Sequence, residues 1–199
     1  MNTALFIEII AVALSLLYVW LAAKENKWCW LFGGIGSAIY VYINFTSHLY
    51  YDTLLQLYYV LVAVYGLLHW NKTNTKSQVE VRPISKQNLV FVLALSAIAT
   101  YFLGEWSKAH IAQNTSHLDA GVTIFSLVAT WLTARKILES WLLWIAIDIA
   151  ATFMYYLKGL HATTLLYILF TIMAVYGYFK WKKTASTKGE NQDLQHASS

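Results

Sequence analysis

The chain matches itself when it is shifted by 111 residues, and the match runs without a gap. The matched positions include Trp30 with Trp141, Trp70 with Trp181, and the Ala-Val-Tyr-Gly sequences at 63–66 and 174–177. A duplication in so apolar a sequence predicts two similar helical bundles that face each other within a membrane. Such a pair of bundles is typical of proteins whose central pocket, near the bilayer midplane, opens to either side in turn.

The composition places this duplication in a lipid bilayer. Hydrophobic residues make up 58% of the 199 residues and charged residues only 12%, which is more apolar surface than a soluble domain of this size can bury. The one proline, Pro83, lies in a polar connection, so it does not interrupt the apolar stretches. We therefore expect an all-α integral membrane protein.

Seven stretches are long and apolar enough to cross the hydrocarbon core of a bilayer. They lie near 3–23, 28–46, 50–70, 88–104, 119–136, 140–157 and 161–181. The first differs from a secretory signal because no Lys or Arg precedes it. Its Ser-Leu at 15–16 and Trp-Leu at 20–21 also recur at 126–127 and 131–132. We expect this first stretch to be retained as a span.

The basic residues predict the orientation of the chain. Of the 14 Lys and Arg residues, all except Lys108 and Lys158 fall on one side of the predicted membrane. Because the cytoplasmic side carries the excess of Lys and Arg, we expect the N-terminus outside and the C-terminus in the cytoplasm. The same residues account for the formal net charge of +4, and no nucleic-acid-binding motif accompanies them.

The fourth stretch has no counterpart in the repeat, so the predicted architecture is three helices, one linker helix and three helices. An odd linker helix returns the chain to its starting side, which makes the two three-helix repeats parallel. The expected domains are a first bundle at 1–70, a cytoplasmic linker with the fourth helix and an outer loop at 71–118, a second bundle at 119–183, and a disordered cytoplasmic tail at 184–199.

The residue that most suggests a binding site is Asp148, near the middle of the sixth stretch. A carboxylate is costly at that depth unless it faces a cavity, a partner or a cation. Trp144 lies one helical turn before it and Tyr155 two turns after it, so an indole, a carboxylate and a phenol share one face. Such a face can hold a flat cationic ring by stacking and counter-charge. The alternative is a carboxylate that hydrogen-bonds another helix or cycles a proton.

The first copy carries different residues at the matched positions. Gly33, Ser37 and Asn44 match Trp144, Asp148 and Tyr155, respectively, so we expect an asymmetric pocket, with the small residues serving close helix packing. Gln56 and its counterpart Tyr167 are further candidates for ligand contacts, or for bonds between helices. At the basic ends of the third and seventh stretches, Trp70 and Trp181 are expected to pack and to anchor at the interface.

Other kinds of chemistry lack the residues to perform them. The six histidines form no metal-ligand cluster by spacing, and Cys29 is the only cysteine. The sequence contains no His-Glu-x-x-His, Gly-x-Ser-x-Gly or P-loop lysine motif. We therefore expect no metal, no cofactor and no enzymatic activity.

Several of these residues together resemble the PnuC-type vitamin transporters, with their PnuC and PnuT branches, whose fold is akin to that of the SWEET sugar transporters. The resemblance covers residues 3–183 and rests on Trp141-Leu-Leu-Trp144-x-x-x-Asp148, Leu54-Leu55-Gln56, Tyr65-Gly66 with Trp70, and Asp119 followed by Arg135-Lys136-x-x-Glu139-Ser140-Trp141. It implies seven helices, a homotrimer in the bacterial inner membrane, and facilitated diffusion of an unphosphorylated B-vitamin precursor, which a cytoplasmic kinase then traps. It also implies that the vitamin is bound by Trp144, Asp148, Gln56 and Tyr167, within an aromatic cage completed by Tyr40 and Tyr59.

The chain departs from the nicotinamide riboside transporters of this family at the site itself. It has Asp148 where those members have Asn, and Ser140 where they have Asn within Glu-Asn-Trp. Thiamine and nicotinamide riboside both present a flat cationic ring, and the fixed carboxylate favours thiamine, with nicotinamide riboside as the alternative. More distant alternatives are a SWEET-like sugar carrier, a proton channel and a membrane sensor. Phosphorylated vitamins are disfavoured because no Arg or Lys lies at membrane depth.

Overall fold

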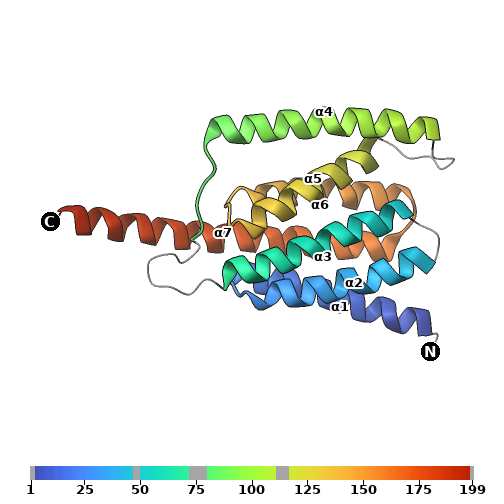
Figure 1. Cartoon of the computed structure of the whole chain (residues 1–199), viewed down its shortest axis with the longest axis horizontal. Coiled ribbons are helices and arrows are strands. Elements are labelled where there is room, and N and C mark those ends of the chain that lie inside the picture. The colour runs from blue at the N-terminus through green and yellow to red at the C-terminus, as the bar shows by residue number, and fades with distance from the viewer. Residues whose placement is uncertain (1–2, 47–49, 72–79, 111–116, 198–199) are drawn as a thin grey trace. The chain divides into compact units, whose positions relative to one another are not determined.

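The computed structural model describes residues 3–46, 50–71, 80–110 and 117–197. These residues form seven α-helices (Figure 1). The helices are α1 (Thr3–Ala23), α2 (Trp28–Thr46), α3 (Tyr50–Trp70), α4 (Lys86–His110), α5 (His117–Ala134), α6 (Ser140–Leu157) and α7 (His161–Ala197). The predicted spans at 3–23, 28–46, 50–70 and 140–157 coincide with α1, α2, α3 and α6 at both ends.

The helices have the length and composition of membrane spans. Six of them, α2 to α7, contain a stretch long and apolar enough to cross a bilayer, and α1 contributes a shorter apolar helix at Ile9–Ala23 within the described residues. The protein is therefore an all-helical, multi-pass membrane protein, as the composition predicted. The arrangement of these helices as two parallel repeats around a linker helix stays a prediction.

Two helices differ from the predicted spans at their ends because of a side-chain cap in one and a backbone conformation in the other, neither of which hydropathy registers. α4 begins at Lys86 because the Ser85 hydroxyl accepts a hydrogen bond from the Asn88 amide at 3.3 Å, which caps the first turn. α5 ends at Ala134, since Lys136 adopts a left-handed φ of 54° that cannot continue a helix.

The C-terminal segment differs more. We expected residues 184–199 to be disordered, whereas α7 continues through this segment to Ala197. The segment is polar, but it holds only one glycine and no proline, and it includes Ala, Lys, Glu, Gln and Leu, which favour helix. A helix already formed in the membrane needs no new nucleus to extend into such a sequence.

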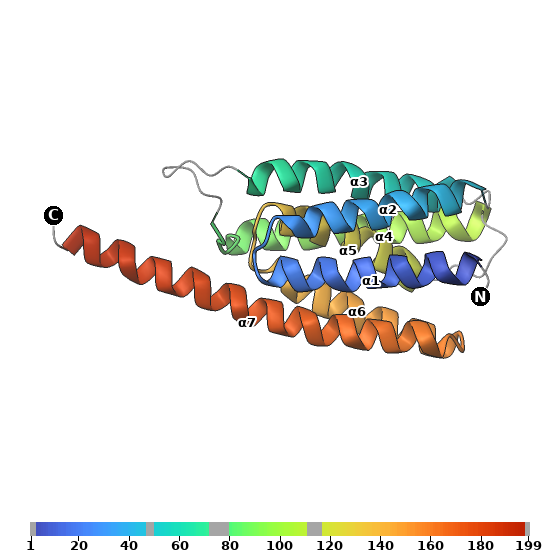
Figure 2. The same ribbon diagram turned by 90° about the horizontal axis from the view of Figure 1, so that it is seen from below.

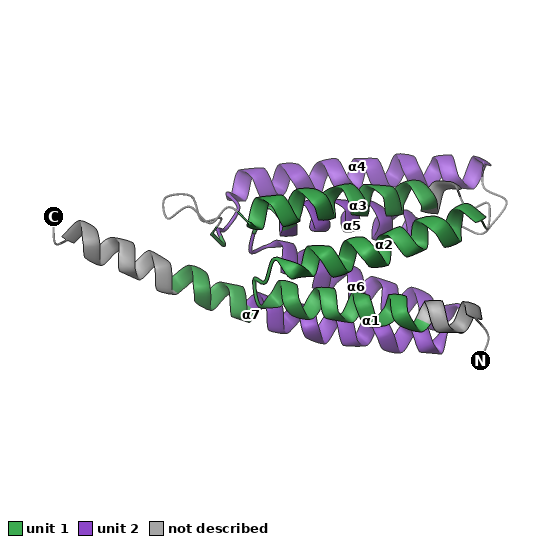
Figure 3. Ribbon diagram, turned by 60° about the horizontal axis from the view of Figure 1, so that its bottom comes forward, with its two compact units in different colours: residues 1–81, 134–136, 179–199 green, residues 82–133, 137–178 purple. Residues whose placement is uncertain are grey.

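The chain divides into two compact units (Figure 3). Unit 1 comprises residues 1–81, 134–136 and 179–199, and unit 2 comprises residues 82–133 and 137–178. In unit 1, α2 packs against both α1 and α3, so the three helices lie side by side (Figure 2). In unit 2, α5, α6 and the connection between them supply a buried apolar cluster formed by Ala129, Leu132, Ile137, Leu143 and Ile147.

One tryptophan–glycine contact occurs in each unit. In unit 1, the ring of Trp30 occupies the space that a Cβ on Gly66 would need, and in unit 2 a Cβ on Gly177 would lie 2.7 Å from the ring of Trp141. The two tryptophans are matched positions of the 111-residue repeat, and so are the two glycines. Each glycine is required by the close approach of the ring. The duplication is therefore evident in the packing as well as in the sequence.

Candidate substrate site

Asp148 is buried on α6, with 4% of its surface exposed. Its helical neighbours Ile147 and Ala151 are buried and apolar. The Thr152 hydroxyl donates to the backbone carbonyl of Asp148 at 2.7 Å, but within the described ranges no hydrogen bond or ion pair is formed by the Asp148 carboxylate. A buried carboxylate without a partner is unfavourable unless a ligand or a cation supplies one. The predicted role of this carboxylate in binding a ligand stays a prediction.

Trp144, one turn before Asp148, is held in a fixed position. Its indole Nε1 donates to the Thr133 hydroxyl on α5 at 3.1 Å, and that hydroxyl donates in turn to the Ala129 carbonyl at 2.8 Å. The indole is half-buried and packs against the apolar cluster of unit 2. Because the edge of the ring is tied down, its orientation does not depend on a ligand, which suits a stacking platform.

Tyr155 and Tyr167 are brought together by α6 and α7. Their rings stack with centroids 5.2 Å apart and an angle of 20° between planes, and Phe170 meets Tyr167 edge-on at 5.8 Å. The ammonium group of Lys158 lies 5.8 Å from the Tyr155 ring. Tyr155 lies on the same helix as Asp148, two turns further along, and forms an aromatic group with the two rings of α7. Trp144, Asp148, Tyr155 and Tyr167 thus all lie in unit 2.

The other four candidates lie in unit 1. Tyr40 and Asn44 are on α2, and Gln56 and Tyr59 are on α3, which packs against α2. All four side chains are half-buried, and the ring of Tyr59 meets that of Tyr58 at 5.8 Å. A joint site made by the candidates of both units stays a prediction.

The small residues of α2 serve close helix packing, as expected. A Cβ on Gly33 would lie 2.8 Å from the ring of Tyr18, so that ring covers the glycine, and a Cβ on Gly34 would lie 3.2 Å from Ala63. The Tyr18 hydroxyl is buried and has no hydrogen-bond partner among the described residues. The ring of Tyr18, from the same bundle, thus fills the space beside Gly33.

A family model described as nicotinamide mononucleotide transporter matches residues 5–183 of the chain. The chain belongs to this family. Its members are transporters, which confirms that the protein is not an enzyme.

Relatives within the nicotinamide mononucleotide transporter family confirm the resemblance to PnuC-type transporters. The chain is 25% identical to the nicotinamide riboside transporter PnuC of Escherichia coli K12, over 96% of this chain and 90% of that protein. It is 28% identical to the nicotinamide riboside transporter PnuC of Neisseria mucosa, over 87% of this chain and 71% of that protein. It is also 22% identical to the riboflavin/roseoflavin transporter RibM of Streptomyces davaonensis, over 87% of this chain and 83% of that protein. A crystal structure of the vitamin B3 transporter PnuC superposes with a TM-score of 0.75 and 25% identity, covering 94% of this chain and 84% of that one.

Sequence reasoning missed two side chains near the candidate residues of this family member. Thr133 fixes the Trp144 indole, and Tyr18 covers Gly33 with a buried hydroxyl. Thr133 matches Ala22 in the repeat, and Tyr18 matches Ala129, so both positions carry dissimilar residues in the two copies. A search for matched positions with dissimilar residues, which drew attention to Gly33 and Trp144, would also have found Thr133 and Tyr18.

Proposed function

We propose that this protein carries nicotinamide riboside across a bacterial inner membrane by facilitated diffusion. The observation that carries the proposal is the buried, unpartnered carboxylate of Asp148, one turn from the fixed indole of Trp144. The pyridinium ring of nicotinamide riboside would stack on the indole and would place its positive charge near the carboxylate. Nothing in α6 supplies a competing cation, because the helix has no Lys or Arg from Ser140 to Leu157.

The choice of vitamin revises our expectation from the sequence. The carboxylate alone favoured thiamine, because both vitamins present a flat cationic ring. The PnuC relatives are named for nicotinamide riboside and vitamin B3, and they support the alternative over thiamine. We propose further that the protein is a homotrimer with its C-terminus in the cytoplasm, and that a cytoplasmic kinase traps the vitamin.

The phosphate-free form of the vitamin suits this site better than the mononucleotide. A phosphate is held by Arg, Lys or a cluster of backbone amides. α6 offers none of these side chains between its ends, and the Asp148 carboxylate would repel the phosphate. We therefore propose the riboside as substrate, although the family as a whole is described by the mononucleotide.

The test is exchange of labelled vitamin into proteoliposomes that hold an excess of unlabelled vitamin. We expect nicotinamide riboside to exchange, and nicotinamide mononucleotide, thiamine, riboflavin and glucose to compete poorly. Faster exchange of thiamine, of riboflavin or of the mononucleotide than of the riboside would overturn the proposed substrate. Binding without exchange would point to a sensor, and ion current across a planar bilayer would point to a channel.

We propose one additional ligand contact, the Tyr18 hydroxyl. Nearly all buried polar groups in proteins are hydrogen-bonded, and this hydroxyl has no partner among the described residues. Tyr18→Phe removes only the hydroxyl, so we expect affinity for nicotinamide riboside to fall by about 0.5–1.5 kcal/mol, or roughly 2- to 10-fold. Thr100→Val is a matched control, because the Thr100 hydroxyl on α4 is also buried without a described partner. Equal affinity of Tyr18→Phe and wild type in equilibrium binding would remove Tyr18 from the site.

A further inference from the structure

Two non-glycine residues with left-handed backbone stand out among the described residues. They are Glu25, with φ of 55°, and Lys136, with φ of 54°. Both occupy the same position of the 111-residue repeat, just after α1 and just after α5. At each, the chain closes the helix with the same bond, from the amide of Asn26 to the carbonyl of Leu21 at 2.9 Å, and from that of Ile137 to that of Leu132 at 3.0 Å.

Glycine is the usual residue at such a helix end, because it adopts the left-handed conformation without steric cost. An unfavourable backbone retained at matched positions indicates that the side chains are needed. The two side chains pair with each other: the Lys136 ammonium lies 3.0 Å from the Glu25 carboxylate. The lysine side chain is 10% exposed and the glutamate side chain 22% exposed, so water screens this pair less than a surface pair.

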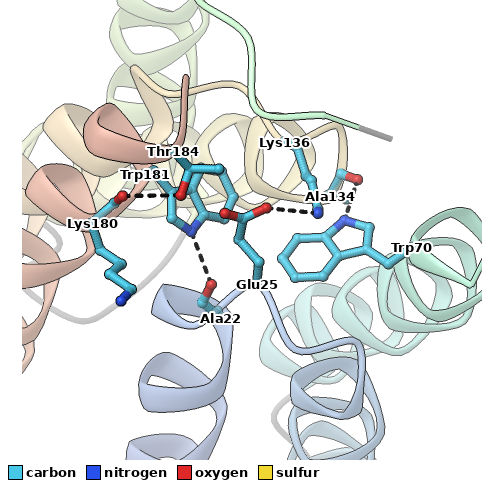
Figure 4. Close-up of polar contacts among 8 residues, drawn as sticks. All are labelled: Ala22, Glu25, Trp70, Ala134, Lys136, Lys180, Trp181 and Thr184. Atoms are coloured by element: carbon cyan, nitrogen blue, oxygen red, sulfur yellow. Dashed lines mark hydrogen bonds and ion pairs between the residues drawn. The ribbon is translucent and has the colours of Figure 1, made fainter. Parts of the chain in front are cut away.

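Two tryptophans close the same cluster (Figure 4). The indole of Trp70, at the end of α3, donates to the Ala134 carbonyl at 2.9 Å, and the indole of Trp181, on α7, donates to the Ala22 carbonyl at 3.1 Å. Each indole thus binds a carbonyl in the last turn of the first helix of the other copy, and the Ala22 carbonyl also accepts a hydrogen bond from the Glu25 amide at 2.9 Å. The Lys136 ammonium also lies 4.9 Å from the Trp70 ring.

These contacts change the role that we expected for the two tryptophans. Trp70 and Trp181 pack as predicted, with ring centroids 5.9 Å apart, but Trp181 is 0% exposed and does not anchor at a membrane interface. All of the residues in the cluster belong to unit 1. The connection after α5 and the later part of α7, which come from the second copy, are therefore held in the same compact unit as α1, α2 and α3.

We propose that Glu25, Lys136, Trp70 and Trp181 form a latch that closes the cytoplasmic end of the transporter and opens to release substrate. The latch joins the first copy to the second at the end of the helices where the basic residues predict the cytoplasm. Release to that side requires the two helix ends to separate, which breaks the ion pair and both indole bonds together. The left-handed backbone at both positions persists because it directs the two charged side chains toward each other.

The first test measures the latch without any substrate. Cys29, the only cysteine, lies one turn after Glu25 and is 0% exposed, so it reports opening of this end. We expect Glu25→Gln and Lys136→Gln each to raise the rate of Cys29 labelling by a charged, membrane-impermeant thiosulfonate at least tenfold. The charge swap, Glu25→Lys with Lys136→Glu, should return the rate to within threefold of wild type. Glu105→Gln is the matched control, because it removes another ion-paired glutamate, bonded to Lys108 at 3.1 Å.

The outcomes of this labelling decide the proposal. Unchanged labelling in both neutralised variants would overturn the latch. Acceleration that the charge swap fails to reverse would also overturn it, because it would report general loosening of the fold. Labelling from the outside of right-side-out vesicles and not from the inside would place the cluster at the other end of the transporter.

The second test asks whether the latch moves during transport, and it rests on the proposed function for its substrate. Glu25→Cys and Lys136→Cys are combined with Cys29→Ser, which is the residue that the second copy has at the matched position 140. Joining the two cysteines with a short, reducible bifunctional reagent should lower nicotinamide riboside exchange at least tenfold while binding persists, and reduction should restore exchange. The Glu25→Cys variant without its partner should exchange at the same rate before and after treatment with the reagent.

Exchange at an undiminished rate in the cross-linked protein would show that this contact stays closed during transport, and it would overturn the proposal. Failure of the wild-type protein to bind or exchange nicotinamide riboside would count against the proposed substrate only. The labelling of Cys29 would then still decide the latch, because it uses no vitamin.

Discussion

Replacing Asp148 by Asn should make the empty protein more stable and its binding of a cationic vitamin weaker. The side chain is 4% exposed, and its carboxylate has no hydrogen bond or ion pair within the described residues. A buried charge without compensation costs several kcal/mol, whereas a buried amide without partners costs about 1–3 kcal/mol. The empty Asp148→Asn protein should therefore gain about 1–2 kcal/mol of stability, which corresponds to a rise in Tm of roughly 2–8 °C for a chain of this length.

The loss of affinity follows from the charge that the substitution removes. A pyridinium about 4 Å from a carboxylate, at an effective dielectric constant of about 20, gains about 4 kcal/mol of attraction. Desolvation of the two ions offsets much of this gain. We therefore expect Asp148→Asn to weaken binding of nicotinamide riboside by about 1–2 kcal/mol, which is roughly 5- to 30-fold in Kd.

The assay compares two ligands that differ in charge and little in shape. Reduced nicotinamide riboside keeps the ribose and the carboxamide, but its dihydropyridine ring is neutral. Isothermal titration of wild type and Asp148→Asn with both ligands gives a four-way cycle that isolates the charge term. The wild type should prefer the cationic ligand, and the variant should bind the two ligands about equally.

Two results would refute this reasoning. An equal loss of affinity for both ligands would show that Asp148 binds the ribose hydroxyls and leaves the ring charge without a counter-ion. A lower Tm of the empty variant would show that the carboxylate has a structural partner, so that its burial is compensated within the protein.

Substitutions at Gly177 and Thr133, each with a control variant, test the packing within unit 2. Gly177→Ala should destabilise the protein by about 1–3 kcal/mol, because the new Cβ would lie 2.7 Å from the Trp141 ring. Gly36→Ala is the control, because its new Cβ would have its nearest atom at 3.7 Å, and its Tm should stay unchanged or rise. Equal Tm values for the two variants would contradict the close contact between Gly177 and Trp141. Thr133→Val should leave the Trp144 indole without its acceptor, which should lower stability by about 1–3 kcal/mol and weaken vitamin binding. Thr133→Ser keeps a hydroxyl and should restore both. Identical Kd values for the Val and Ser variants would show that Thr133 does not position the indole for binding.

The positions of the helices could be predicted from the sequence because hydropathy and length alone set a membrane span. Four helices begin and end where the apolar stretches do. The exceptions lie where the chain leaves the apolar stretch and features other than hydropathy decide the helix ends. Ser85 caps α4 by a side-chain bond, Lys136 ends α5 by its backbone conformation, and α7 extends through a polar segment that hydropathy does not score as helix.

The candidate site was less accessible to sequence reasoning because its contacts join residues that are distant along the chain. Helical spacing identified Trp144 and Asp148 on one face of α6, but not the bond from that indole to Thr133 on α5. The spacing also could not show that Tyr155 stacks on Tyr167, since the two rings belong to different helices. The ion pair between Glu25 and Lys136 joins residues 111 positions apart. In the sequence each of them is one of several charged residues in a polar connection, so nothing local predicts the pair.

The divergence between the two copies has a physical basis at the latch. Glu25 and Lys136 occupy matched positions of the repeat and contact each other, so two identical copies would place two like residues in this contact. Two glutamates or two lysines at the positions of Glu25 and Lys136 would repel each other, so this contact becomes attractive only after the copies differ in charge. Trp70 and Trp181 needed no such change, because an indole that donates to a backbone carbonyl works equally in both directions.

The two copies also differ in which helix carries the aromatic ring beside the candidate site, and here packing gives the reason. In the first copy the ring belongs to Tyr18 on α1 and covers Gly33 on α2, whereas the matched positions of the second copy are Ala129 on α5 and Trp144 on α6. Each bundle thus keeps one large and one small residue at this crossing, but the ring has moved to the other helix. Close packing favours such a paired exchange, since two rings would overfill the crossing and two small residues would leave a void. A single substitution in either copy should therefore be tolerated less well than the exchange of both residues together.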